Sequence, residues 1–157
     1  MNIGLDIHGV INNNPKYFRR VAKEIREDNG SVFIITGKPI DKYLLRELHH
    51  CGFRRIYDEL VSIQDELENM GYRSLYLDSH GRNHYDELAW DSFKANYCRE
   101  HDIDLHIDDT LRYLKYFETP CGHYNNGNLT LFPYNDILAM EFSTEYIDNM
   151  VKTTSII

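Results

Sequence analysis

Short runs rich in apolar residues alternate along this chain with longer amphipathic stretches. The runs at 1–5, 31–36, 72–77 and 104–107 have the length and composition of strands, and 31–36 is apolar enough to be buried on both faces. Between the runs, apolar side chains recur every three or four residues, which is helical spacing. Strands that alternate with helices predict a parallel sheet joined by right-handed crossovers. The predicted fold class is therefore α/β, three-layered and Rossmann-like, with helices on both faces of the sheet.

Capping residues and glycines indicate where the helices begin and end. Asn14 and Pro15 are an N-cap and a first-turn proline, and Gly30 follows the last turn of the helix that they open. A second helix is expected at 41–51 before Gly52. In that helix Leu44, Leu45 and Leu48 are expected to face inward. The segment 54–62 is either a short strand or the start of a helix that ends at Met70. Further helices are expected at 86–99, after 110 and at 143–151, and a final core strand is expected at 129–132 after a turn at 125–128.

Length and composition bound the class of protein. A chain of 157 residues suits one domain, so we expect a single domain over 1–157 with a small insertion at about 60–88. The sequence contains no apolar run of about 18 residues and no signal-peptide pattern. The three cysteines lack the spacing of metal ligands, and reduced thiols are expected. We therefore expect a soluble cytoplasmic protein without a membrane span.

Polar residues follow several of the expected strands directly. Asp6, Thr36, Asp78 and the pair Asp108-Asp109 each come at the end of an apolar run. The carboxyl ends of parallel strands meet at one edge of a sheet, called here the carboxyl rim, where α/β proteins bind their ligands. We therefore expect these side chains to lie together. Taken singly, each has a simpler interpretation, such as a strand-end acid or a turn at Thr36.

At this point the sequence resembles a known family. The segments Leu5–Val10 and Val32–Gly37, then Lys94 in a helix, then His106–Thr110, occur in the order found in the haloacid dehalogenase-like superfamily, most of whose members are magnesium-dependent phosphatases. The resemblance covers about residues 1–110, and 131–135 is similar to the last strand of small nucleotidase-like members. Response-regulator receivers use related groups, but they pair their acids at the first strand and carry the lysine last.

The resemblance implies a role for each matching residue. Asp6 would be the nucleophile that forms an aspartyl-phosphate. Mg²⁺ would be held by Asp6, Asp108, the backbone carbonyl of His8 and, as a second candidate, Asp109. The phosphate would be bound by Thr36, Gly37 and Lys94, with Lys94 neutralising charge as a catalytic residue. Lys38 is a rival for that lysine, although the family order favours the residue 14 positions before Asp108.

His8 is where the chain departs from the family pattern. Phosphatases of the family usually place a second aspartate there, which protonates the leaving oxygen and then activates water. Histidine can perform both proton transfers near neutral pH, so His8 is a candidate catalytic residue. The same substitution is also compatible with slowed turnover or with lost activity, which leaves a phosphate- or magnesium-binding module as the alternative.

Simpler interpretations apply to other residues of the pattern. One acid of Asp108-Asp109 could cap the following helix, and Lys94 could be an ordinary solvated helix lysine. His80 and His84 lie in a polar loop at 79–85 and invite a zinc interpretation, but no further ligands have suitable spacing. A polar loop is the better interpretation, with a role in substrate contact left open.

The substrate is indicated only in outline. The spacing leaves no room for a cap after the first motif, so the site should be open. An open site suits a bulky phosphoester, or a small one if another subunit covers it. A small phosphorylated substrate, nucleotide-like by the resemblance of the final strand, is the first expectation. The net charge of −8 argues against broad nucleic-acid binding. A local basic patch such as Arg54-Arg55, and a phosphate at the end of a nucleic acid, stay open. The sequence does not indicate an oligomeric state.

Overall fold

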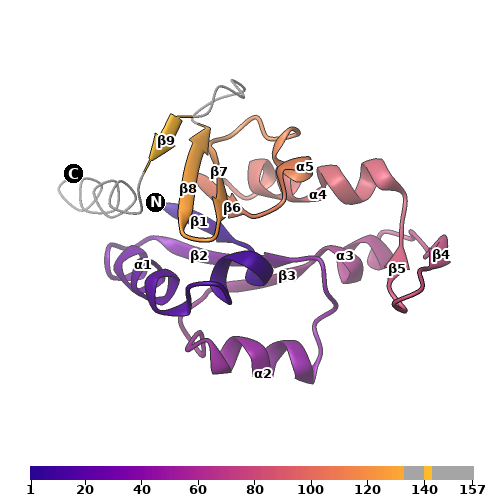
Figure 1. Ribbon diagram of the computed structural model, residues 1–157, viewed down its shortest axis with the longest axis horizontal. Coiled ribbons are helices and arrows are strands. Elements are labelled where there is room, and N and C mark those ends of the chain that lie inside the picture. The colour runs from indigo at the N-terminus through magenta and orange to yellow at the C-terminus, as the bar shows by residue number, and fades with distance from the viewer. Residues whose placement is uncertain (133–139, 143–157) are drawn as a thin grey trace.

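A computed structural model describes residues 1–132 and 140–142, and the helix expected at 143–151 lies outside them. A central sheet has the strand order β3-β2-β1-β6-β7-β8-β9 (Figure 1). The first five strands in that order pair in parallel, whereas β8 and β9 are antiparallel to their neighbours. This confirms a mixed α/β class with a mostly parallel sheet. The strands are β1 (Asn2–Leu5), β2 (Ser31–Thr36), β3 (Glu59–Ser62), β6 (Leu105–Asp108), β7 (Cys121–Asn125), β8 (Asn128–Phe132) and β9 (Met140–Phe142).

Helices cover the sheet in two layers (Figure 1). One core cluster joins α1 (Pro15–Glu27) and α2 (Lys42–His50) to one face of the central strands. The other cluster joins α3 (Ile63–Asn69), α4 (Glu87–Glu100) and α5 (Leu111–Leu114) to the opposite face. The expected helices of the described residues are therefore present, and the sheet is sandwiched between them.

Side-chain caps explain where the helices begin. The Asn14 side chain accepts a hydrogen bond from the backbone N–H of Tyr17, as expected for the start of α1, and Asp41 caps α2 in the same way. Gly52 follows α2 with a φ of +80°, the left-handed conformation that glycine favours. One detail is wrong: Leu44 and Leu48 are buried, but Leu45 is 45% exposed, because it lies off the apolar stripe of α2.

The strand expected at 72–77 is the main error of the sequence prediction. The structure has only a two-residue strand, β4 (Tyr76–Leu77), which pairs antiparallel with β5 (Asn83–His84) in a separate sheet. The β4–β5 hairpin extends beyond α3, far from β1 in Figure 1. Both β4 side chains are exposed, so a longer strand here would gain no stability from burial in the central sheet. Asp78 therefore turns a surface hairpin instead of lying at the carboxyl rim.

The far edge of the central sheet also differs from the expectation of parallel strands. Strand β7, which the sequence did not predict, forms a tight hairpin with β8 through Asn126 and Gly127, both in the left-handed region. The predicted strand at 129–132 is confirmed, but β9 pairs outside it, so it is not the last. Among the described residues, no helix has both the length and the apolar character to cross a membrane.

Candidate active site

The pairing of β1 with β6 brings two acids together. Leu5 is the register partner of Ile107, and each is followed by an aspartate, Asp6 and Asp108. The backbone N–H of Asp6 donates to the carbonyl of Ile107 at 3.1 Å, which continues the ladder past the end of β1. Both aspartates are buried. The sheet therefore places two carboxylates side by side at its carboxyl rim.

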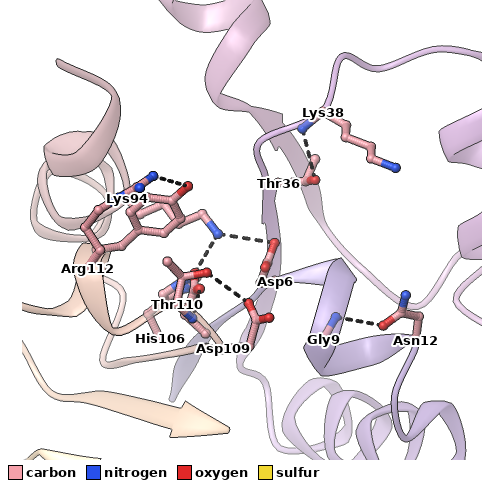
Figure 2. Close-up of polar contacts among 12 residues, drawn as sticks. Asp6, Gly9, Asn12, Thr36, Lys38, Lys94, His106, Asp109, Thr110 and Arg112 are labelled. Atoms are coloured by element: carbon pink, nitrogen blue, oxygen red, sulfur yellow. Dashed lines mark hydrogen bonds and ion pairs between the residues drawn. The ribbon is translucent and has the colours of Figure 1, made fainter. Parts of the chain in front are cut away.

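Lys94 of α4 joins these two acids (Figure 2). Its Nζ lies 2.5 Å from Oδ2 of Asp108 and 3.2 Å from Oδ1 of Asp6, and its side chain is buried. Lys38, the rival lysine, is exposed, and its side chain points away from Asp6 in Figure 2. The geometry therefore places Lys94, and not Lys38, between the acids, and Lys94 is no solvated helix lysine.

One ammonium shared between two buried carboxylates sets the electrostatics. Burial raises the pKa of Asp6 to about 7, against the opposing effect of Lys94. Burial alone would also raise the pKa of Asp108, but the shorter contact with Lys94 and a bond from His106 hold it well below its usual value. Burial lowers the pKa of Lys94, but the two carboxylates raise it more, so the lysine stays charged.

Asp109 adds a third carboxylate to the rim. Ligand oxygens of Asp6, Asp108 and Asp109 lie within 4.8 Å of one another, the one such group of potential metal ligands found among the described residues. Gly9 makes room for Asp109: a Cβ at position 9, where φ is +81°, would lie 2.2 Å from Oδ2 of Asp109. Carboxylate oxygens at this separation fit a hard divalent cation such as Mg²⁺.

The acids do not cap the next helix as the alternative interpretation had it. The N-cap of α5 is Thr110, which makes no side-chain capping bond. Oδ1 of Asp108 accepts from the Thr110 backbone N–H at 2.9 Å, and Asp109 accepts from its hydroxyl at 3.2 Å. These bonds orient both carboxylates, so Thr110 serves the rim more than the helix.

Thr36 and Gly37 lie at the end of β2, the strand next to β1. The Thr36 side chain is buried, and its Oγ1 accepts from the backbone N–H of Lys38 at 3.3 Å (Figure 2). The Thr36 hydroxyl is the acceptor in this bond, so its hydrogen takes no part in it. A Cβ on Gly37 would lie 3.0 Å from the ring of Trp90, so the turn runs close to that indole.

His8 lies in the turn after β1, where the chain leaves the sheet. Its Nε2 is 3.0 Å from a carboxylate oxygen of Glu47 on α2, and both side chains are about one-third exposed. The backbone N–H of the next residue, Gly9, donates to the Asn12 side chain at 2.8 Å and closes the turn. His8 is therefore held by α2 and does not join the three carboxylates.

Two further side chains, His106 and Tyr113, lie at the site without a role predicted from the sequence. His106 is buried and its Nε2–H donates to Oδ2 of Asp108 at 3.1 Å; burial lowers its pKa, which favours the neutral ring. Its position two residues before Asp108 on one strand was the available clue, because such residues share a face. Tyr113 lies with its ring 5.3 Å from Nζ of Lys94 and accepts a bond from the indole of Trp90 at 3.0 Å.

The polar loop at 79–85 stays away from this site. His84 contacts Asp78 at 3.0 Å within the β4–β5 hairpin, and among the described residues neither His80 nor His84 lies in a group of potential metal ligands. The loop is therefore a hairpin turn, and its expected place at the carboxyl rim is wrong.

The chain matches none of the protein-family models, curated proteins or solved structures with which it was compared. The class that fold and site define is an α/β protein with a buried acid–lysine–acid cluster at its carboxyl rim. Any narrower assignment depends on the chemistry of these residues.

Proposed function

We propose that the protein is a Mg²⁺-dependent phosphate monoester hydrolase with a haloacid dehalogenase-like fold. The observation that carries the proposal is the charge of the rim: three carboxylates and one ammonium leave a formal charge of −2 when all are ionised. A phosphate dianion cannot approach such a site until a cation offsets this charge. A divalent cation has the opposite charge of the same size, and carboxylate oxygens are ligands that it prefers.

Asp6, Asp108 and Asp109 would hold the cation, which supplies positive charge to the substrate phosphate when bound. Lys94 then lies beside Asp6, where its ammonium can also contact a phosphate oxygen, and Thr36 can donate its hydroxyl to another. Thr110 and His106 fix the two β6-end acids in orientation. The chain's own groups thus provide orientation and charge, the two requirements of phosphoryl transfer.

The reaction would proceed in two balanced steps. A carboxylate oxygen of Asp6 attacks phosphorus, the bond to the leaving oxygen breaks, and that oxygen takes a proton from His8, giving an alcohol and an aspartyl-phosphate. Water then attacks phosphorus, His8 takes its proton, and Asp6 is released with inorganic phosphate. In the structure Nε2 of His8 is paired with Glu47, so both proton transfers require the His8 ring to turn from α2 towards Asp6.

The test is turnover of an aryl phosphate with Mg²⁺ by the wild-type chain and by Asp6→Asn. We expect the substitution to lower kcat at least about a thousandfold, because it removes the nucleophile. Arg99→Gln, an exposed change on the outer part of α4, is the matched control and should retain the wild-type rate. The absence of Asp6-dependent release at every pH from about 5 to 9 would overturn the proposal.

A second candidate is a phosphate- or magnesium-binding module without turnover. The observation that favours it is the pairing of His8 with Glu47, which draws the ring towards α2 instead of the three carboxylates. Asp6-dependent turnover separates the two functions, and His8→Asp is a finer test of what the histidine does. A slower reaction would show that His8 transfers protons, whereas a faster one would show that histidine restrains a step that aspartate performs. A nucleotide-like phosphorylated substrate is our first choice for either function, and a panel of mononucleotides and sugar phosphates tests it.

A further inference from the structure

Charge is distributed very unevenly over the chain. Residues 13–55 contain ten of the 17 lysines and arginines but only five of the 25 aspartates and glutamates. The other residues therefore carry seven basic and 20 acidic side chains. Residues 13–55 include α1 and α2, which form one layer of the structure (Figure 1). The net charge of −8 thus conceals a basic layer on one side of an acidic protein.

A groove in this layer borders the turn after β1. It has a volume of about 640 Å³ and lies between the start of α1 and α2, with Tyr43, Arg46 and His50 along it. Its lining also includes Asn12 and Glu47, the residues that hold Gly9 and His8 of the turn after β1. The groove therefore adjoins residues that hold the turn from which Asp6 leaves β1.

Basic residues continue beyond this groove around the end of α2. Arg46 also lines a neighbouring hollow of about 620 Å³, together with His49, Arg54 and Arg55. All four side chains are exposed. Arg26, by contrast, forms an ion pair with Asp58 and donates to the backbone carbonyl of Arg55, so it does not belong to this basic surface. Arg46 thus connects two hollows into one basic track, defined here as Arg46, Arg54 and Arg55 with the histidines beside them.

An aromatic ring lies on the same track. Tyr43 is 64% exposed and lines the same groove as Arg46. An exposed tyrosine among cations suits a single-stranded nucleic acid, because backbone phosphates bind arginines while a base stacks on the ring. A phosphorylated peptide offers the charges but not the regular bases. Nucleic acid is therefore the anionic partner that these residues fit best.

We propose that the basic track binds single-stranded nucleic acid and directs a terminal phosphate of the strand towards Asp6. The second half of this statement depends on the proposed phosphatase function, whereas the first half does not. The track also resolves an apparent conflict in the sequence: an overall acidic chain repels nucleic acid broadly, but this layer attracts a strand in one place and one direction.

The experiment measures binding apart from catalysis. Fluorescence anisotropy follows a labelled oligothymidylate of about 12 nucleotides, carrying a terminal phosphate, bound to the Asp6→Asn chain at about 50 and 200 mM NaCl. The test variant adds R46E, R54E and R55E. The matched control adds R82E, R99E and K115E, which change the charge equally but lie outside residues 13–55. We expect at least about tenfold weaker binding for the test variant, with a shallower salt dependence, and less than about twofold for the control.

Tyr43→Ala provides an independent second measurement. It should weaken binding about fivefold or more without changing the salt dependence, because stacking does not displace counterions. The proposal is overturned by no binding at low salt, by equal weakening in both triple variants, or by a phosphopeptide that binds as tightly as the oligonucleotide. Aryl phosphate turnover by the wild-type chain is measured separately. Turnover without oligonucleotide binding would contradict only the nucleic-acid proposal. Oligonucleotide binding without turnover would contradict only the proposed phosphatase function.

Discussion

Asp108 and Asp78 each follow a short apolar run, yet the structure uses them in opposite ways. Asp108 ends a strand of the central sheet and is buried against Lys94 and His106. Asp78 ends a two-residue strand of a surface hairpin, where its carboxylate accepts bonds from the backbone N–H groups of His80 and Arg82. An aspartate that follows a strand thus belongs to the buried charged cluster in one case and stabilises a surface turn in the other.

The difference lies in what pairs with each strand. Strand β6 lies between β1 and β7, so everything at its carboxyl end meets groups from neighbouring strands. Strand β4 pairs only with β5, and the two residues of β4 are exposed. Strand-end aspartates form a site only where neighbouring strands and helices supply groups that contact them. Substitutions in the two regions test this contrast.

Lys94→Met should have the largest effect on stability. It leaves Asp6 and Asp108 buried without their ammonium, which should lower the free energy of unfolding by about 3–5 kcal/mol. Urea unfolding at neutral pH measures the change. Lys115→Met, at an exposed position just beyond α5, is the control and should change little. Equal stabilities of the two variants would show that the cluster is not electrostatically coupled.

Addition of Mg²⁺ sharpens the same experiment. A cation bound by the three carboxylates should stabilise the wild-type chain by an amount that grows with the logarithm of its concentration, and Lys94→Met at least as much, because that variant has more uncompensated negative charge. The midpoint of urea unfolding with and without Mg²⁺ measures this. A midpoint that Mg²⁺ leaves unchanged in both chains would contradict a cation site at the rim.

Glycine-to-alanine substitutions compare the two regions directly. Gly9 and Gly81 both have positive φ, +81° and +73°, but a Cβ would meet Asp109 at position 9 and nothing within 4 Å at position 81. Gly81→Ala should therefore cost about 1 kcal/mol of backbone strain. Gly9→Ala should cost about 1–3 kcal/mol more, from the clash with Asp109.

Binding of a divalent cation gives the second measure for this pair. Gly9→Ala should weaken it by displacing the Asp109 carboxylate, whereas Gly81→Ala should leave it at the wild-type value. Isothermal titration calorimetry with Mg²⁺ records both. If the two variants bind the cation equally, Asp109 is not a ligand and the site consists of Asp6 and Asp108.

The smallest expected effect belongs to Asp78→Asn. The bond from His84 and the backbone N–H groups lower the pKa of Asp78 to about 2. Since the folded pKa lies below the usual value of about 3.9, the carboxylate stabilises the hairpin above that value and loses this effect as pH falls towards 2. Amide NMR shifts of the hairpin should follow this titration and flatten in the variant. Activity and global unfolding should not change, because the bonds of Asp78 to His80, Arg82 and His84 all lie within the hairpin.

The parts of the fold that could be predicted are those with partners close in sequence or with buried strands. Residues 31–36 are continuously apolar, and Asn14 and Asp41 are local caps, so β2, α1 and α2 follow from short stretches. Strand β7 contains Gly122 and His123, and its identity as a strand depends on β6 and β8 beside it. The prediction of a strand at 72–77 was wrong because composition alone does not reveal that a strand lacks neighbours.

The candidate site divides in the same way. The placement of Asp6, Asp108 and Lys94 agrees with the ordered motifs, since each ends a strand or faces inward from a helix. The contact of His8 with Glu47 joins positions 39 apart, a distance over which periodicity carries no information. The space that Gly9 provides for Asp109 likewise joins the turn after β1 to the residue after β6, and it could be found only in three dimensions.

The register of β1 against β6 has a consequence for how the site comes into being. A slip of one residue would separate Asp6 from Asp108 and turn their neighbours to the opposite face. The two acids are 102 positions apart in the chain, so no partly folded N-terminal half can hold them together. A cation that requires both would bind only chains whose central strands have paired correctly. Cation affinity is then an assay of correct folding as much as of chemistry.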